Sequence, residues 1–191
     1  MIWIMARGDD GIDVATLVVR AREGDVDAFA SLVDRYEVRL LRFAMRTLGD
    51  RQDAEDVVQD TLVQAWRSLN ALDAPAAFGT WVYRMASNRC TDVLRKRTSR
   101  STDPVDPEDM GIHPDERASV EKRVEARSAL ERFAEVFSTL STEQRITWVL
   151  HQMEGLSYAE VADTLGITEG SVRGRIHRAR AAIVEGMKGW T

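Results

Sequence analysis

The sequence predicts an all-α protein made of two small helical domains joined by an acidic flexible linker, with a helix-turn-helix in the C-terminal domain. Apolar residues recur at helical spacing on both sides of a central segment, and no run alternates with the period of a strand. Three of the four prolines lie in that segment, Ser101 to Glu116, which holds six acids and no lysine or arginine. Such a composition is typical of an extended, solvated linker.

These observations divide the chain into a disordered extension (1–11), a helical domain (12–98), the linker (99–119) and a second helical domain (120–191). The hydrophobic content of 44% is enough for two cores. Cys90 is the only cysteine, which excludes a disulfide framework and favours a reducing, cytoplasmic setting with a packing role for the thiol. The apolar run at the start is too short for a signal peptide or a membrane span, so no membrane contact is expected.

The segment DRQDAEDVVQDTLVQAWRSL, residues 50–69, is expected to form a helix with two distinct faces. Its core stripe consists of Ala54, Val58, Leu62, Ala65 and Leu69. On a second face, three polar side chains surround one valine at i, i+3, i+4 and i+7, namely Asp56, Gln59, Asp60 and Val63. This pattern fits a docking surface for a basic partner and fits an ordinary solvated face equally well.

After the turn-like NALDAPAAFGT comes a basic helix, WVYRMASNRCTDVLRKR, in which the inward positions include Val82, Ala86 and Cys90. From Arg84 to Arg100 there are six basic residues and one acid. Three aromatic residues lie at the start of this helix beside the loop: Phe78, Trp81 and Tyr83. Aromatic rings beside a basic groove are typical of sites for single-stranded nucleic acid, although Trp81 fits a core position better.

The C-terminal domain carries clear signals for helix ends. Ser141 with Gln144, and Ser157 with Glu160, match the capping box, so a helix is expected to begin at each serine. The second helix should end at Gly166, and the turn Gly166-Ile167-Thr168 then provides the next N-cap. Two short helices joined in this way form a helix-turn-helix.

The last helix separates apolar from basic residues. Its buried stripe is Val172, Ile176, Ala179 and Ile183, expected to face Val161, Ala162 and Leu165. The opposite face presents Ser171, Gly174, Arg175 and Arg178, flanked by Arg173, His177 and Arg180. Arginines on such a face can bind phosphates or guanine edges in the major groove. The alternative is a solvated charged face, which is the usual meaning of a charge run, but the helix-turn-helix signals favour DNA.

Catalysis finds no support in the sequence. His113, His151 and His177 lack metal-ligand spacing, and no nucleophile motif or glycine-rich phosphate loop is present. We therefore expect a protein that is not an enzyme and has no cofactor and no bound metal.

Three segments in this order resemble the small extracytoplasmic-function group of bacterial RNA polymerase sigma factors. DAEDVVQDTLVQAWRSL resembles their polymerase-binding helix, and AFGTWVYRMASNRCTDVLRKR is similar to the helix that recognises and melts the −10 element. LSTEQRITWVLHQMEGLSYAEVADTLGITEGSVRGRIHRAR resembles their −35-binding domain.

The resemblance implies a sigma factor that binds core polymerase and directs initiation at promoters with −10 and −35 elements. It implies that the β′ clamp helices are met by Asp56, Gln59, Asp60 and Val63. It implies −10 contacts from Asn70, Asp73, Phe78, Trp81, Arg84, Asn88 and Arg95. It implies −35 contacts from Ser171, Arg173, Gly174, Arg175, His177 and Arg178. The other implied partners are the β flap and an anti-sigma protein.

Two departures from the family leave the promoter sequence open. The loop LDAPAAF contains no basic residue, and Gly174 occupies a position often held by serine. The alternative functions are a stand-alone helix-turn-helix regulator, which usually needs a dimer helix that is not evident here, and an adaptor that binds polymerase without reading DNA. The adaptor would leave the arginine face unexplained.

Overall fold

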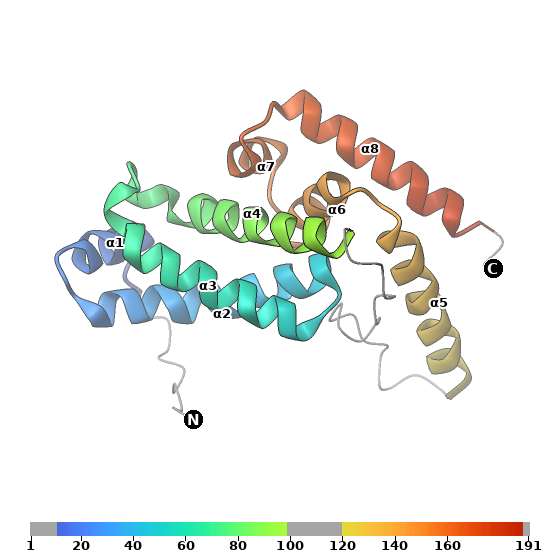
Figure 1. Ribbon diagram of the computed structural model, residues 1–191, viewed down its shortest axis with the longest axis horizontal. Coiled ribbons are helices and arrows are strands. Elements are labelled where there is room, and N and C mark those ends of the chain that lie inside the picture. The colour runs from blue at the N-terminus through green and yellow to red at the C-terminus, as the bar shows by residue number, and fades with distance from the viewer. Residues whose placement is uncertain (1–10, 99–119, 189–191) are drawn as a thin grey trace.

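The computed structural model describes residues 11–98 and 120–188, so the predicted extension and acidic linker lie outside the described residues, save for Gly11. Within those ranges every regular element is a helix (Figure 1). The N-terminal half contains α1 (Val14–Arg22), α2 (Val26–Leu48), α3 (Arg51–Ser68), the short turns η1 (Leu69–Ala71) and η2 (Pro75–Ala77), and α4 (Phe78–Thr98). The C-terminal half contains α5 (Val120–Ser138), α6 (Thr142–Trp148), the π-helical turn η4 (Val149–Met153), α7 (Tyr158–Leu165) and α8 (Glu169–Gly186). The predicted all-α class is confirmed.

The first three helices begin at aspartates. The carboxylates of Asp13, Asp25 and Asp50 each accept a hydrogen bond from the backbone N–H three residues on, which satisfies one of the amides left open at a helix start. Gly49 then ends α2 in the left-handed conformation, with φ 61°. Because α3 starts directly after this turn, it runs back along α2.

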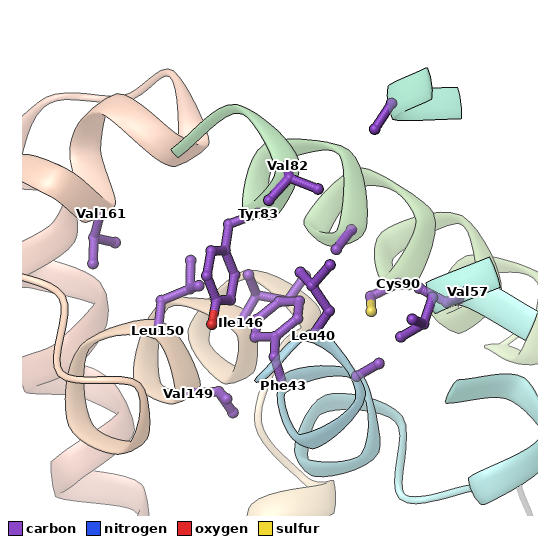
Figure 2. Packing of buried hydrophobic residues seen from close by; sticks show 14 of the residues in the cluster. Leu40, Phe43, Val57, Val82, Tyr83, Cys90, Ile146, Val149, Leu150 and Val161 are labelled. Atoms are coloured by element: carbon purple, nitrogen blue, oxygen red, sulfur yellow. The ribbon is translucent and has the colours of Figure 1, made fainter. Parts of the chain in front are cut away.

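The core of the N-terminal half lies between α2, α3 and α4. Leu40, Phe43, Val82 and Cys90 are fully buried there (Figure 2). Cys90 therefore has the packing position that the sequence predicted, and burial raises the pKa of its thiol.

The helix signals of the C-terminal half are confirmed. Ser141 and Ser157 each form a complete capping box, with Gln144 and Glu160 respectively. Gly166 ends α7 at φ 65°, and the Thr168 hydroxyl accepts from the N–H of Ser171 to begin α8. The π-helical turn after α6 carries no signal that sequence analysis used, and it was not predicted.

The two halves pack directly against each other, which the sequence did not predict. In Figure 1, α4 lies between the α2–α3 pair and the α7–α8 pair, and α6 lies beside the C-terminal end of α4. The buried apolar side chains form one continuous cluster that reaches from Val57 in α3 to Val161 in α7 (Figure 2). The protein thus has one shared core, and part of the surface of α4 is covered by the C-terminal half.

Candidate nucleic-acid and polymerase interfaces

The helix-turn-helix holds α8 by a buried apolar stripe. Val172, Ile176 and Ala179 are buried, as are Val161 and Ala162 of α7, so the predicted inner face is confirmed. On the outside, Ser171, Arg173, His177 and Arg178 are exposed, and Gly174 and Arg175 are partly exposed. The structure therefore brings all six predicted −35 residues to one outer surface of one helix.

Arg173 contacts two neighbours on the surface of the helix-turn-helix. Its guanidinium carbon lies 5.3 Å from the centre of the Tyr158 ring, and its Nη2 lies 3.2 Å from Oε2 of Glu169. The Tyr158 ring stacks in turn on His151, with centroids 4.3 Å apart. Sequence analysis did not include Tyr158 among the site residues, although an aromatic ring at the start of the first helix of the motif could have been noticed.

Gly174 provides space for Arg178. A Cβ placed on Gly174 would lie 3.3 Å from Nη1 of Arg178, so the guanidinium lies against the bare backbone of α8. A glycine inside a helix costs about 1 kcal/mol relative to alanine.

The predicted −10 surface on α4 is formed by exposed side chains on three turns of one helix, with Arg84, Asn88 and Arg95 facing outward. Asn70 and Asp73 are exposed in the loop that precedes α4. Arg95 lies 3.4 Å from Asp92 of its own helix, in an exposed pair that contributes little to stability.

Several of the basic residues of α4 are engaged within the fold. Arg97 donates to Asp53 at 2.5 Å and to the carbonyl of Leu48 at 2.7 Å, which ties α4 to the α2–α3 turn. Arg89 forms a 2.8 Å ion pair with Asp60. The Nε of Arg84 donates to the carbonyl of Thr164 at 3.1 Å, and its Nη2 donates to the carbonyl of Asp163. The basic count of this helix therefore overstates the charge available to DNA.

Phe78, which was predicted to contact the −10 element, is buried in this structure. Its ring is 1% exposed and lies edge-on to Tyr36, with centroids 5.2 Å apart, so neither ring face is open to a base. Trp81 is partly buried and packs on the same cluster at 6.0 Å from Phe78. Phe78 lies on the apolar face of α4 and packs into the buried cluster. An aromatic residue at the start of a helix can point inward as easily as outward, so its position in the sequence does not decide between the two.

The loop before α4 is supported by a residue that sequence analysis missed. Arg22, the last residue of α1, donates from Nε to the carbonyl of Leu69 at 3.2 Å and from Nη2 to the carbonyl of Leu72. Leu72 is buried beneath the loop. Arg22 thereby fixes the backbone on both sides of Asn70, and no local pattern in the sequence links it to a loop about 50 residues away.

The predicted polymerase-binding residues lie together on the exposed face of α3: Asp56, Gln59, Asp60 and Val63. Trp66, one turn beyond Val63, was not predicted. It is 41% exposed, and its ring packs at 4.7 Å on that of Phe29. The i, i+3 spacing from Val63 could have identified Trp66 as a member of the same face. With Val63 and Trp66 both exposed, one end of this face of α3 is apolar.

The described residues contain no cluster of three histidine, cysteine or acidic side chains placed to hold a metal ion. In the same part of the chain, no helix has the length and apolar character needed to cross a membrane.

Comparison with known proteins identifies both halves of the chain. Residues 32–100 match the family described as Sigma-70 region 2, which spans most of α2 together with α3 and α4. Residues 130–183 match the family described as Sigma-70, region 4, which includes the helix-turn-helix.

Relatives match over nearly the whole chain. The ECF RNA polymerase sigma factor SigM of Mycobacterium tuberculosis is 35% identical, over 88% of this chain and 82% of that protein. Among solved structures, CnrH in complex with the cytosolic domain of CnrY matches with a TM-score of 0.68 and 31% identity, over 90% of this chain and 95% of that one. CnrH is an RNA polymerase sigma factor of Cupriavidus metallidurans. The sigma factor RpoE of Bartonella quintana, solved with the anti-sigma factor NepR, matches with a TM-score of 0.65 and 26% identity, over 86% and 99%.

Proposed function

Since this chain belongs to the extracytoplasmic-function (ECF) group of RNA polymerase sigma factors, we propose that its α8, α4 and α3 surfaces make three separate contacts. As a sigma factor, the protein binds core RNA polymerase and directs promoter-specific transcription initiation through −10 and −35 elements. The assignment of residues to these contacts, with the domain bounds 12–98 and 120–191, is our proposal.

The outer face of α8 meets the −35 element. The observation that carries this assignment is the division of one helix into a buried apolar stripe and an exposed surface with Arg173, Arg175 and Arg178. Arginine can donate two hydrogen bonds to a guanine edge or to a phosphate. Ser171, Gly174 and His177 complete this surface, and Tyr158 with Glu169 orients Arg173.

The −10 element is met by the loop before α4 and by the outer face of that helix. Asn70 and Asp73 present polar groups from a loop whose backbone Arg22 holds. Asn88, Arg95 and Arg84 line the helix, and Trp81 supplies the partly exposed ring beside the loop. Phe78 supports the loop from within the core and makes no contact with a base.

The exposed face of α3 docks on the β′ clamp helices of the polymerase. Asp56, Gln59 and Asp60 supply the polar part of this face, and Val63 with Trp66 supplies an apolar part. We assign a second contact with the core enzyme, at the β flap, to the C-terminal half of this chain.

We propose an anti-sigma protein as a further partner, because the match to RpoE of B. quintana comes from its complex with NepR. Sigma factors are initiation factors rather than enzymes, and we propose that this chain acts in the cytoplasm without a catalytic residue of its own.

Run-off transcription with core enzyme tests the assignment of α8. Holoenzymes carrying Arg175→Ala or Arg178→Ala are compared with the parent on promoters with intact and scrambled −35 elements, at two salt concentrations. Loss of a base contact should reduce the difference in holoenzyme binding free energy between the two promoters by about 1–3 kcal/mol. Loss of a phosphate contact should instead weaken binding to both promoters equally and reduce the salt dependence of binding. Glu185→Ala, an exposed change at the far end of α8, is the control. Unchanged binding and selectivity in both arginine variants would remove the −35 assignment.

A further inference from the structure

Helix α2 carries a row of arginines that none of the three proposed contacts uses. The row has four members at i, i+4, i+7 and i+11, namely Arg35, Arg39, Arg42 and Arg46. Since an α-helix turns by about 100° per residue, these side chains leave α2 within an arc of about 60°. We call these four residues the α2 arginine stripe.

The stripe is unfavourable for the helix itself. Like charges at i and i+4 repel each other across one turn, and Arg35 with Arg39 and Arg42 with Arg46 are two such pairs. No acid of α2 lies three or four residues from Arg39 or Arg42, the spacing at which side chains of one helix pair. These two arginines also form no ion pair with an acid in the part of the chain that the structure describes. Binding of an anion would relieve the repulsion.

The end of the stripe is engaged in the fold, whereas its middle is exposed. Nη1 of Arg46 donates to Oε1 of Glu154 at 2.9 Å, and the hydroxyl of Tyr83 donates to Oε2 of the same carboxylate at 3.1 Å. The side chain of Glu154 is only 5% exposed, so Arg46 neutralises a buried charge. Arg39 and Arg42 are exposed and are the members of the stripe that can meet a partner.

Arg39 lies close to the start of α4, which runs beside α2 (Figure 1). Its guanidinium carbon lies 5.9 Å from the centre of the Tyr36 ring. That ring lies edge-on to Phe78, the first residue of α4, with centroids 5.2 Å apart. A Cβ placed on Gly79 would lie 3.0 Å from the Tyr36 hydroxyl oxygen, so Tyr36 packs against the bare backbone of the first turn of α4. A short chain of contacts therefore joins Arg39 to the end of the loop proposed for the −10 element.

The charge of Arg39 is also felt at two tyrosines that pack near this turn. Burial raises the pKa of Tyr36, and the charge of Arg39 opposes the rise. The pKa of Tyr83 is raised first by burial and then by the charge of Glu154, and Arg39 opposes this rise as well. Arg39 thus places positive charge beside the first turns of α4.

The loop before α4 has polar groups and no positive charge of its own. Residues 70–77 contain no lysine or arginine, and Asp73 among them is exposed and acidic. Three arginines of α4 are bonded within the fold: Arg84 to α7, and Arg89 and Arg97 to α3. A single strand carries one phosphate per nucleotide, and proteins that bind it place cations along its backbone. The exposed arginines of α2 supply such cations next to the loop.

The charge of the stripe indicates the kind of partner. Asp56 and Asp60 on α3 suit a basic surface, whereas Arg39 and Arg42 suit an anion. The planar guanidinium group of arginine can donate two hydrogen bonds to one phosphate. Residues three apart are separated by about 4.5 Å along a helix axis, so two such side chains can reach neighbouring phosphates of one strand.

We propose that Arg39 and Arg42 of α2 bind backbone phosphates of the single DNA strand whose bases meet the loop before α4. Contacts of this kind add affinity and position the strand, and they carry no base specificity. The proposal rests on the proposed −10 role of the loop, and its test is separate from base recognition.

The salt dependence of binding tests the proposal in holoenzyme. The ligand is single-stranded DNA with the non-template −10 element of a promoter that the holoenzyme transcribes. For single strands the logarithm of the binding constant falls with the logarithm of salt concentration by about 0.7 per neutralised phosphate. Arg39→Gln and Arg42→Gln together should therefore reduce the slope by about 1.4. Between about 50 and about 200 mM salt, the parent should lose about sevenfold more affinity than this double variant.

Arg51→Gln is the charge-matched control for each single variant, because Arg51 is an exposed arginine of α3 outside the stripe. Arg39→Gln and Arg42→Gln should each reduce the slope by about 0.7, and Arg51→Gln should leave it unchanged. Co-purification with core enzyme and circular dichroism should show normal polymerase binding and helix content in all three variants.

A neutral phosphate analogue locates the contact. Methylphosphonate is placed at one position of the strand at a time, which removes one negative charge and leaves the bases intact. The parent and Arg51→Gln should lose affinity when the analogue lies beside the captured bases. The double variant should show no loss at those same positions, since the arginines that would meet those phosphates are gone.

Three outcomes would overturn the proposal. The first is a parental slope in the double variant, and the second is a loss of affinity that is equal for charged and neutral strands. The third is normal DNA binding with weaker binding to core enzyme or to an anti-sigma protein, which would make the stripe a protein-docking surface. Asn70→Ala and Asp73→Ala test the loop itself: if base substitutions in the −10 element affect these holoenzymes as they affect the parent, the role of the loop fails while the methylphosphonate result stands.

Discussion

The outer faces of α4 and α8 are both basic, yet they differ in what they contact. On α8, Arg173 pairs with Glu169 and Tyr158 of its own helix-turn-helix, and Arg178 lies along its own backbone. On α4, Arg84 donates to α7 in the other half, and Arg89 and Arg97 are tied to α3. The proposed −10 face is thus partly covered by the other half, whereas Arg173 and Arg178 of the proposed −35 face contact residues of their own helix-turn-helix.

This difference shows that a count of basic residues does not measure a DNA surface. On α8, Arg173 contacts Glu169 and Tyr158 within the same half, whereas Arg84 and Arg97 of α4 are bonded to other helices of the fold. The two faces should therefore respond differently when α7, the helix that packs on both α4 and α8, is altered.

The largest effect is expected from Val161→Asp. Val161 is 0% exposed in α7, and a carboxylate there would be buried without a partner, at a cost of about 4 kcal/mol or more. The helix-turn-helix should unfold, and −35 selectivity should be lost. Binding to core polymerase through α3 should remain, because Leu40, Phe43 and Cys90 pack between α2, α3 and α4 at a distance from the helix-turn-helix (Figure 2). Chemical denaturation and co-purification with core enzyme measure the two results.

Val184→Asp is the matched control, since Val184 is exposed on α8 and a carboxylate there stays hydrated. If Val161→Asp kept its −35 selectivity, the shared α7–α8 core would not be what orients the arginines. If Val161→Asp also lost binding to core polymerase, the fold of the N-terminal half would depend on the C-terminal half.

Sequence reasoning was most successful where the signal is local. The capping boxes at Ser141 and Ser157, the left-handed Gly166 and the buried stripe on α8 all follow from side chains within a few residues of each other. The helical spacing of residues in α3 also predicted which side chains would be exposed there, and only Trp66 was overlooked.

Sequence reasoning failed where a contact joins distant segments. The spacing of Tyr83 and Arg84 is that of any helix surface, and nothing near them indicates that Glu154 or the end of α7 will meet them. Arg22 lies about 50 residues from the loop it supports. Phe78 was assigned to DNA because aromatic rings near basic residues suit nucleic acid, but the apolar cluster beneath the loop buried it. Tertiary packing decides such cases.

An intermediate effect is expected from Ser157→Ala. Loss of this N-cap removes the acceptor for the N–H of Glu160 and should destabilise the C-terminal half by about 1 kcal/mol. Ser141→Ala removes the equivalent cap of α6 and should cost a similar amount. The midpoint of urea unfolding measures both, and Ser128→Ala, an exposed serine in the interior of α5, serves as the control. A change near zero for Ser157→Ala would mean that packing alone sets the start of α7.

The smallest effect is expected from Glu160→Gln, because the capping box of α7 should depend on pH and that of α6 should not. In α7 the reciprocal acceptor is the carboxylate of Glu160, whose pKa is lowered from 4.5, first by the Ser157 backbone N–H and then by the Ser157 hydroxyl. A lowered pKa in the folded state gives stability that is present above pH 4.5 and is lost as the pH falls through the folded value. In α6 the same position holds Gln144, which does not titrate. Glu160→Gln should therefore cost a few tenths of a kcal/mol near neutral pH, since the group is exposed and screened, and progressively less as the pH falls through the folded pKa of Glu160. Gln144→Glu is the reverse variant and should give α6 the acid dependence that α7 has. Unfolding midpoints of the parent and both variants, measured across this pH range, test the pair. A difference between the parent and Glu160→Gln that stays constant down to the lowest pH would show that the carboxylate contributes no more than a neutral amide to the cap of α7.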